Sequence, residues 1–364
     1  MTASGGGWNG SGSSRPSRYS PPPIRPDKRA LVATVGVIGG GQLGRMLALA
    51  GIPLGLTFRF LDPAPDAAAG EVGELLVGPY DDPDLLDRLA DGASAVTFEF
   101  ENVPVGAARR VGALPGPAAL EASQDRLAEK RLFRQLGIPT ARFDDEVEAF
   151  PALLKTRWLG YDGKGQRLVE TRPVGADDVL EELVPFEREL SLLSVRGRGG
   201  ETRFYPLVEN MHRAGILHLS RTPAAAAPQA QAETYATRLL DELDYVGLLA
   251  LELFEVGGEL LANEFAPRVH NTGHWTIEGS ITSQFENHLR AILGLPLGST
   301  AACSRTAVMV NVIGHEPERD AILAVPGSHL HLYGKKERAG RKLGHVTLLD
   351  PTPTCVRKIE RLVS

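Results

Sequence analysis

An apolar run meets a cluster of glycines and then a helical pattern in residues 31–63, LVATVGVIGGGQLGRMLALAGIPLGLTFRFLDP. A second apolar run follows and ends at Asp62. This order predicts the opening βαβ unit of a Rossmann-like domain. Gly39, Gly41 and Gly44 satisfy the spacing G-x-G-x-x-G, which allows a tight turn and aims the N–H groups of a helix N-terminus at an anion.

The same glycines leave a dinucleotide-dependent dehydrogenase as a rival interpretation. Asp62 follows Gly44 by 18 residues, close to where an acid binds ribose in such enzymes. A phosphate on any small molecule would satisfy the same N–H groups. Further along, Glu99 and Glu101 end a predicted strand, the position at which open α/β sheets bind ligands. An exposed edge strand explains these two carboxylates equally well.

Length and composition limit the class of protein. A chain of 364 residues exceeds what one core usually supports, which predicts two or three domains. The net charge of -6 argues against a general nucleic-acid binder. Only two cysteines occur, and no apolar run approaches the roughly 18 residues of a membrane span, so we expect a cytoplasmic protein. Residues 1–30 are rich in Gly, Ser, Pro and Arg and are expected to be a disordered extension.

Two apolar strands each carry one carboxylate, Glu252 in LLALELF and Glu264 in LANEFA, with glycines at 257–258 between them. The pattern predicts a hairpin. A two-residue turn would pair Glu252 with Asn263, whereas a three-residue loop that includes Glu259 would pair Glu252 with Glu264. Only the second register gives two carboxylates that could bind Mg²⁺ together, and in the first they point to opposite faces.

A new domain is expected to start near Pro117. Lys155 emerges from the apolar strand ALLKTR, and the glycine-rich loop GYDGKG at 160–165 has N–H groups suited to closing over phosphates. A snorkelling lysine and an ordinary hairpin loop would explain each feature alone. Their combination favours nucleotide binding. Glu189 then interrupts another apolar strand, where it could accept hydrogen bonds from ribose hydroxyls.

The order of these motifs resembles that of ATP-grasp enzymes and, among them, of N5-carboxyaminoimidazole ribonucleotide synthetases. The resemblance runs from about Val35 to His345. Seven blocks carry it: GGGQLGRMLALAG at 39–51, SQDRLAEKRLF at 123–133, GYDGKGQ at 160–166, EELVPFERELS at 181–191, YPLVENMHRAGIL at 205–217, NEFAPRVHNTGHWT at 263–276 and YGKKERAGRKLGH at 333–345. Leu159 is a departure, because that family more often has glycine there, and it is expected to reduce mobility at that end of the loop.

The resemblance implies a fold of mixed α/β and α+β class. After the extension 1–30, it implies a Rossmann-like domain at 31–118, an ATP-grasp lid region at 119–182, an ATP-grasp large domain at 183–300 and a β-rich substrate-binding region at 301–364.

The resemblance also implies roles for individual residues. The residues expected to bind ATP as co-substrate are Arg126, Lys155, Gly160, Tyr161, Asp162, Gly163, Lys164, Gly165, Gln166, Glu181, Glu182, Leu183, Val184, Glu189, His212, Asn263 and Glu264. Those expected to hold Mg²⁺, or Mn²⁺ in its place, are Glu252 and Glu264. Those expected to bind the second substrate are Gln42, Leu43, Glu99, Asn271, Thr272, Lys335, Arg341 and Lys342. The expected catalytic residues are Tyr161, Asp162, Arg268 and His270.

The implied reaction is phosphorylation of bicarbonate by ATP, followed by transfer of the carboxyl group from carboxyphosphate to N5 of 5-aminoimidazole ribonucleotide in purine biosynthesis. Arg268 would stabilise the phosphate leaving group, and loop closure would exclude water. The implied assembly is a homodimer, with neither nucleic acid nor membrane as a partner. Three rivals remain: the dehydrogenase, a formate-using ATP-grasp enzyme that acts on glycinamide ribonucleotide, and a catalytically silent binding protein. The basic residues of 335–342 also fit a solvated loop.

Overall fold

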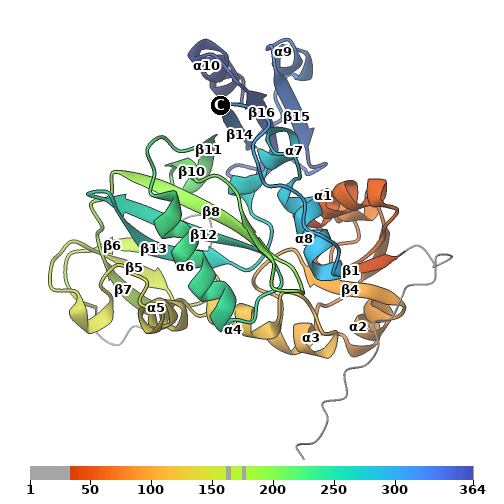
Figure 1. The fold of residues 1–364 in the computed structure, drawn as a ribbon, viewed down its shortest axis with the longest axis horizontal. Helices are drawn as coiled ribbons and strands as arrows, with labels where there is room; N and C mark the ends of the chain where they lie inside the picture. The colour runs from red at the N-terminus through yellow and green to blue at the C-terminus, as the bar shows by residue number, and fades with distance from the viewer. Residues whose placement is uncertain (1–32, 161–164, 174–177, 364) are drawn as a thin grey trace, which may run out of the picture. The chain divides into compact units, whose positions relative to one another are not determined.

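The computed structural model describes residues 33–160, 165–173 and 178–363. The predicted extension 1–30 lies outside the described residues, as do Tyr161, Asp162, Gly163 and Lys164 of the glycine-rich loop. Val32–Ser364 forms one compact unit. Its described residues build a four-stranded, a three-stranded and a nine-stranded sheet (Figure 1).

The four-stranded sheet is parallel, with the strand order β3-β2-β1-β4. Its strands are β1 Thr34–Ile38, β2 Thr57–Asp62, β3 Glu74–Val77 and β4 Ala93–Phe98, and its helices are α1 Gln42–Gly51, α2 Pro83–Ala90 and α3 Val105–Arg110, with short 3-10 turns at Ile52–Leu54 and Ala68–Glu71. The central strand β1 is almost wholly buried, as a parallel strand covered on both faces must be. The predicted βαβ unit is therefore present.

Two helices follow α3 along the chain. α4 spans Pro117–Gln124 and α5 spans Arg126–Gln135. Asp125 separates them with an extended backbone, and its side chain accepts a hydrogen bond from Leu127 N and so caps α5. The guanidinium of Arg157 also binds both oxygens of Asp125, each at 2.6 Å. The block SQDRLAEKRLF at 123–133 is therefore divided between the end of α4 and the start of α5.

The three-stranded sheet is antiparallel and has the order β6-β5-β7. Its strands are β5 Ala152–Thr156, β6 Gln166–Val169 and β7 Asp178–Glu182, and the 3-10 turn Asp144–Glu146 precedes them. The central strand β5 carries Lys155 directly after the buried Leu154.

The nine-stranded sheet has the order β13-β12-β8-β10-β11-β14-β16-β15, with β9 paired to β8. Its strands are β8 Arg188–Arg196, β9 Thr202–Phe204, β10 Val208–Arg213, β11 Ile216–Thr222, β12 Gly247–Val256, β13 Glu259–Ala266, β14 Ala307–Ile313, β15 Ser328–Leu332 and β16 Lys342–Leu349. The C-terminal strands continue the same sheet, because β14 pairs with β11.

Helices cover this sheet and bring the segment after β13 toward the N-terminal domain. α6 Gln229–Glu242 lies across β8 (Figure 1), and α8 Gln284–Leu293 packs between α1 and β12. The 3-10 turn Asn271–Gly273 and α7 Thr276–Gly279 follow β13, while α9 Arg319–Leu323 and α10 Pro353–Leu362 pack on the C-terminal strands. Trp275 and Phe285 are fully buried in a core shared with α1. The segment that follows Arg268 and His270 is thus packed between α1 and the nine-stranded sheet.

Candidate active site

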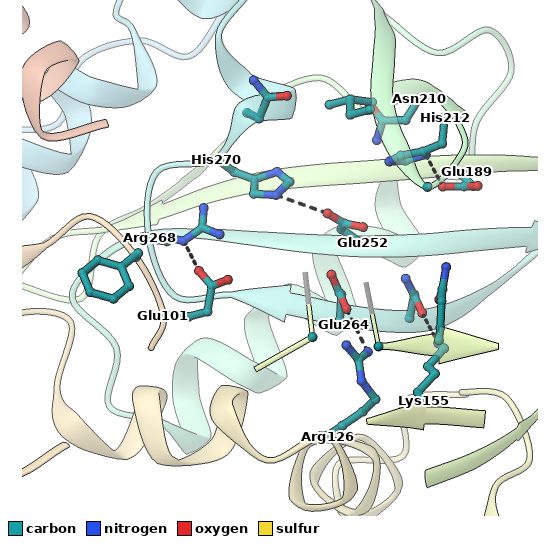
Figure 2. Close-up of a pocket in the computed structure, with 18 of the residues that line it drawn as sticks. Glu101, Arg126, Lys155, Glu189, Asn210, His212, Glu252, Glu264, Arg268 and His270 are labelled. Atoms are coloured by element: carbon teal, nitrogen blue, oxygen red, sulfur yellow. Dashed lines mark hydrogen bonds and ion pairs between the residues drawn. The ribbon is translucent and has the colours of Figure 1, made fainter. Parts of the chain in front are cut away.

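Residues from the two antiparallel sheets, from α1 and from the segment after β4 surround one cavity of about 650 Å³ (Figure 2). The predicted site residues that line it are Gln42, Leu43, Glu99, Arg126, Lys155, Gly160, Gly165, Gln166, Glu189, His212, Glu252, Asn263, Glu264, Arg268, His270, Asn271 and Lys342. The predicted residues that do not line it are Glu181, Glu182, Leu183, Val184, Thr272, Lys335 and Arg341.

Glu252 and Glu264 face each other across the β12–β13 hairpin. The turn has two residues, since Val256 pairs with Glu259 and both glycines between them have positive φ, 60° and 84°. A β-bulge at Asn263 then shifts the register, so that Glu252 pairs with Glu264. The three-residue loop was therefore wrong, and a two-residue turn combined with the bulge produces the pairing that metal binding requires.

The charge of one of these carboxylates opposes the ionisation of the other. Burial, and then the charge of Glu264, raise the pKa of Glu252 to about 8. His270 Nε2 lies 3.2 Å from Glu252 Oε1, and Arg126 Nη1 lies 2.9 Å from Glu264 Oε2. Mg²⁺ is commonly held by one or two carboxylates together with substrate phosphates and water. The donor set at the end of this hairpin fits that pattern.

A buried ion network holds Lys155 at the cavity. Glu181 Oε2 lies 2.9 Å from Lys155 Nζ and 3.1 Å from Lys130 Nζ, and both Glu181 and Lys130 are almost wholly buried. Burial opposes ionisation of Glu181, but the two lysines lower its pKa to about 2. Glu181 therefore holds Lys155 in position without lining the cavity itself. The sequence analysis did not identify Lys130, since a lysine in a polar helical block carries no sign of burial.

The neighbouring part of the cavity combines an ion pair with an aromatic pair. Glu189 Oε2 lies 2.6 Å from His212 Nδ1; burial lowers the pKa of His212, but the carboxylate more than offsets this and the net pKa is raised. Phe186 and Phe254 stack with ring centroids 4.7 Å apart and also line the cavity. The sequence analysis missed this aromatic pair.

None of the four residues 181–184 that the resemblance assigns to ATP lines the cavity. Glu182 Oε2 pairs with Arg142 Nε at 2.7 Å, and Leu183 is exposed. The ATP-binding role of these four residues stays a prediction.

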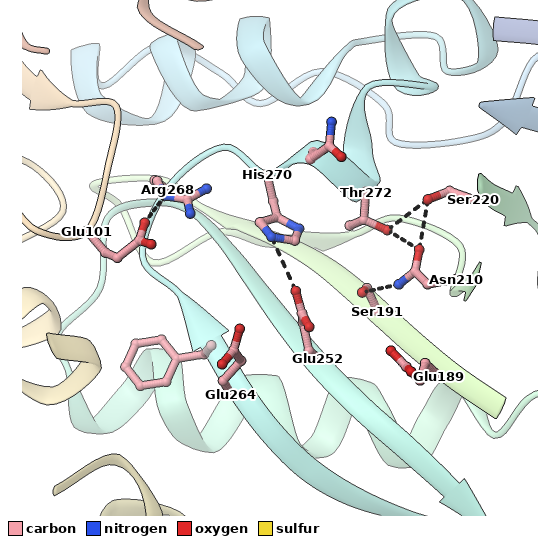
Figure 3. A network of polar contacts seen from close by, with 12 residues as sticks. Glu101, Glu189, Ser191, Asn210, Ser220, Glu252, Glu264, Arg268, His270 and Thr272 are labelled. Atoms are coloured by element: carbon pink, nitrogen blue, oxygen red, sulfur yellow. Dashed lines mark hydrogen bonds and ion pairs between the residues drawn. The ribbon is translucent and has the colours of Figure 1, made fainter. Parts of the chain in front are cut away.

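Arg268 and His270 lie at the other end of the cavity, where Figure 3 shows them with their partners. Arg268 Nε pairs with Glu101 Oε2. Burial, and then the charge of Arg268, lower the pKa of His270 well below its usual range, so this imidazole is neutral. Glu101, which ends the segment after β4, thus fixes the guanidinium that the sequence predicted to be catalytic.

Thr272 is fully buried and does not reach the cavity, but it helps to orient Asn210, which does. Its hydroxyl donates to Asn210 Oδ1 at 2.7 Å, Ser220 Oγ donates to the same oxygen at 2.8 Å, and Asn210 Nδ2 donates to Ser191 Oγ at 2.6 Å (Figure 3). Asn210 lines the cavity, although the sequence analysis quoted it only as part of a block. Its amide, held by three buried hydroxyls, has a fixed orientation.

The glycine-rich turn after β1 is filled by a side chain of the same protein. Glu99 Oε1 and Oε2 accept hydrogen bonds from Gly41 N and Gly44 N, the latter at 2.7 Å. A Cβ at Gly39 or Gly41 would collide with Glu99. Asp62 in turn accepts from Gly40 N at 2.8 Å. The glycines therefore accommodate Glu99, and the N–H groups that a pyrophosphate would need are already bonded.

The basic C-terminal segment is divided between two cavities. Lys342 lines the cavity described above, whereas Lys335 and Arg341 line an adjacent one of about 880 Å³. Gln42 lines both. Burial, and then the charge of Arg341, lower the pKa of Lys335 to about 8. The three cations thus bracket the N-terminus of α1 from two sides.

Leu159 adopts the left-handed conformation, with φ of 62°, and is exposed. The backbone before the glycine-rich loop therefore has the geometry that glycine adopts without strain. At the other end of the loop, Gly165 has φ of 75°, and a Cβ there would collide with Thr156.

Comparisons with known proteins match most of the described unit. Family models described as the ribonucleotide synthetase preATP-grasp domain, the ATP-grasp domain and the phosphoribosylaminoimidazole carboxylase C-terminal domain match residues 32–124, 132–285 and 307–358. The chain is 52% identical over 339 residues to the N5-carboxyaminoimidazole ribonucleotide synthase of Pseudomonas aeruginosa, covering 86% of this chain and 94% of that protein.

Solved structures of the same family are similar to this chain in sequence and in fold. The N5-carboxyaminoimidazole ribonucleotide synthetase of Thermus thermophilus is 54% identical, with a TM-score of 0.85, 91% of this chain and 98% of that chain covered. The synthase of Aspergillus clavatus in complex with ADP and 5-aminoimidazole ribonucleotide is 29% identical, with a TM-score of 0.79, 90% and 99% covered. The predicted fold, a Rossmann-like domain followed by an ATP-grasp fold, is confirmed.

Proposed function

This chain belongs to the N5-carboxyaminoimidazole ribonucleotide synthase family, and we propose that the cavity of about 650 Å³ is the site at which it carries out that family's reaction. The protein is an ATP-dependent ligase of purine biosynthesis that carboxylates 5-aminoimidazole ribonucleotide with ATP and bicarbonate. The observation that carries the site assignment is the pairing of Glu252 with Glu264 beside Lys155 and Arg126 in one cavity.

ATP is assigned to the end of the cavity formed by the two antiparallel sheets. Lys155 and Arg126 supply positive charge for the triphosphate, and Glu189 can accept hydrogen bonds from ribose hydroxyls. The stacked pair Phe186 and Phe254 offers an apolar surface for the adenine ring. The loop 160–166, including the residues outside the described part, is assigned to the phosphates from the sequence alone.

Mg²⁺, for which Mn²⁺ could substitute, would be held by Glu252 and Glu264. When bound, the ion would offset the negative charge of the ATP phosphates. A divalent cation would also keep Glu252 ionised despite the burial that raises its pKa.

Bicarbonate would be phosphorylated between the nucleotide and Arg268. The Arg268 guanidinium, fixed by Glu101, can stabilise the phosphate that leaves when the amine attacks carboxyphosphate. His270 is neutral, and its Nε2 lies 3.2 Å from Glu252 Oε1, so the tautomer protonated at Nε2 would leave the Nδ1 lone pair to take the amine proton. Nδ1 is buried and has no hydrogen-bond partner among the described residues.

The ribonucleotide is assigned to the space between α1 and the basic segment. Lys335, Arg341 and Lys342 would hold its phosphate, with Gln42 between the two cavities. Because Glu99 already binds the N–H groups of Gly41 and Gly44, the dehydrogenase interpretation loses its pyrophosphate site.

Two finer expectations rest on the family resemblance: a homodimer and a cytoplasmic location. Sedimentation of the purified protein would test the first and cell fractionation the second. Among the helices that the structure describes, none combines the length and the apolar character needed to cross a bilayer.

Isotope transfer would test the chemistry. If bicarbonate attacks the γ-phosphorus of ATP, one of its oxygens bridges carbon and phosphorus, and it leaves with phosphate when the amine takes the carboxyl group. Bicarbonate labelled with ¹⁸O should therefore yield phosphate carrying one ¹⁸O. Unlabelled phosphate during ribonucleotide-dependent turnover would rule out carboxyphosphate. Turnover with formate and glycinamide ribonucleotide would instead favour the formate-using rival.

A further inference from the structure

A group of four rings, of which Tyr333, His345 and His274 are buried and His331 is half-buried, lies beneath the basic segment 334–342, and its members do not line either cavity. Tyr333 and His345 are almost completely buried, and Tyr333 Oη lies 2.8 Å from His345 Nδ1. His331 stacks on His345, with centroids 4.5 Å apart and an interplanar angle of 10°. The ring of His274 lies 4.9 Å from that of His345. The reaction assigned above uses none of these four rings.

The hydrogen bond between the phenol of Tyr333 and the imidazole of His345 joins two neutral groups. Burial, and then the proximity of His274, lower the pKa of His345 well below its usual range, while burial raises the pKa of Tyr333. Both groups are therefore neutral near pH 7. The tautomer of His345 sets the direction: the phenol O–H donates to an Nδ1 lone pair, or an Nδ1–H donates to the phenol oxygen.

Tyr333 and His345 stand at the two ends of the segment that carries Lys335, Arg341 and Lys342. The backbone closes at the same place, because Tyr333 N donates to Leu343 O at 2.8 Å. A Cβ at Gly344 would collide with the carbonyl oxygen of His331, so β15 and β16 are pressed together here. The side-chain bond and the backbone bond together close the base of the segment.

The same rings contact the segment that carries His270. His274 packs edge-on against Tyr333, with centroids 6.2 Å apart. Gln284 Nε2 lies 3.3 Å from His274 Nδ1 and donates to His270 O at 2.7 Å, while Gln284 Oε1 accepts from His270 N at 2.9 Å. The ring cluster thus links the base of the basic segment to the backbone of His270.

We propose that Tyr333 and His345 are positioning residues, which through their buried hydrogen bond hold Lys335 and Lys342 at the correct distance from His270 for the phosphate of the ribonucleotide. This inference rests on the proposed function, in which those lysines bind that phosphate. Neither residue touches substrate. Their effect is on how well the basic segment is organised before the ribonucleotide binds.

The test is Tyr333→Phe, which removes one hydroxyl and keeps the ring. The KM for the ribonucleotide should rise about five-fold, the effect of losing one net hydrogen bond. The KM for ATP should stay within about two-fold of the unmodified protein. Tyr245→Phe is the matched control, since it removes another buried hydroxyl, one that donates to Leu248 O, and should leave the KM for the ribonucleotide unchanged.

A double-mutant cycle separates positioning from general loss of packing. His345→Phe should raise the same KM, and adding Tyr333→Phe to it should have no further effect, because the bond is already broken. Additive effects, an unchanged KM for the ribonucleotide in Tyr333→Phe, or an equal rise in the KM for ATP would each overturn the proposal.

Hydrogen exchange keeps this test separate from the proposed function. Amides of residues 334–342 should exchange several-fold faster in Tyr333→Phe, whereas those of β12 should not change. If the unmodified protein shows no ribonucleotide-dependent turnover, the proposed function fails, and faster exchange would still support the hydrogen-bonded base. Unchanged exchange would refute the positioning role whatever the activity.

Discussion

Replacing Glu181 with glutamine is expected to destabilise the fold by roughly 3 kcal/mol at pH 7. One oxygen of this carboxylate binds both Lys155 and Lys130, and the neutral amide would leave two buried cations without a counter-charge. The fall in the pKa of Glu181 from 4.5 to about 2 gives the magnitude, at about 1.4 kcal/mol per pH unit. Removing one partner of a buried ion pair typically costs about 3–5 kcal/mol, which agrees.

The sign of the pH dependence follows from the lowered pKa. A carboxylate whose pKa falls on folding contributes its full stability above the unfolded value of 4.5 and loses it as the pH falls toward 2. The difference between Glu181→Gln and the unmodified protein should therefore be largest near pH 7 and shrink below pH 4.5. Lys155 should also lose its orientation, so the KM for ATP should rise.

Urea unfolding at several pH values is the assay, and the adjacent residue provides the control. Glu182 pairs with Arg142, whose side chain is 52% exposed, and such surface pairs contribute about 0–1 kcal/mol. Glu182→Gln should therefore cost less than about 1 kcal/mol. The reasoning is refuted if the two variants unfold at the same urea concentration, or if the cost of Glu181→Gln grows as the pH falls.

Three further outcomes are expected. Glu264→Gln should lower ADP release at saturating ATP by at least about 100-fold, because one of the two metal-binding carboxylates is lost. The circular dichroism spectrum and the thermal midpoint of unfolding should stay near their original values. Turnover within ten-fold of the unmodified protein would contradict the metal assignment. Lys342→Ala should raise the KM for the ribonucleotide about ten-fold with little change for ATP, and an unchanged value in steady-state kinetics would remove this lysine from the phosphate site. Leu159→Gly should raise the free energy of unfolding by between 0 and about 1 kcal/mol, because glycine removes the strain at φ of 62° but adds entropy to the unfolded chain. A clear loss of stability in urea unfolding would mean that the exposed leucine side chain makes a stabilising contact.

Local patterns in the sequence were sufficient for the strands and for the order of the domains. The run TVGVI before the glycines and the pair LLALELF and LANEFA fold as predicted, because continuous apolar runs bounded by glycine have few alternatives to buried strands. The motif order also identified the family, which the comparisons confirm.

Register and burial were beyond the sequence pattern. Whether Glu252 meets Glu264 depends on a bulge at Asn263, and an alternating pattern cannot show where an extra residue will be accommodated. The buried Lys130 and the reciprocal pairing of Glu101 with Arg268 join residues far apart in the chain. Likewise, G-x-G-x-x-G predicts a turn that accepts an anion but not that Glu99 of the same protein is the anion.

ADP release by the purified protein with Mg²⁺ and ATP, in the presence and absence of bicarbonate and of 5-aminoimidazole ribonucleotide, tests the central claim most directly. We predict release that requires the ribonucleotide, increases with bicarbonate and is lost in Glu264→Gln. Release that ignores both substrates, or none at all accompanied by tight binding of NAD(H), would contradict the assignment of this cavity to the carboxylation reaction.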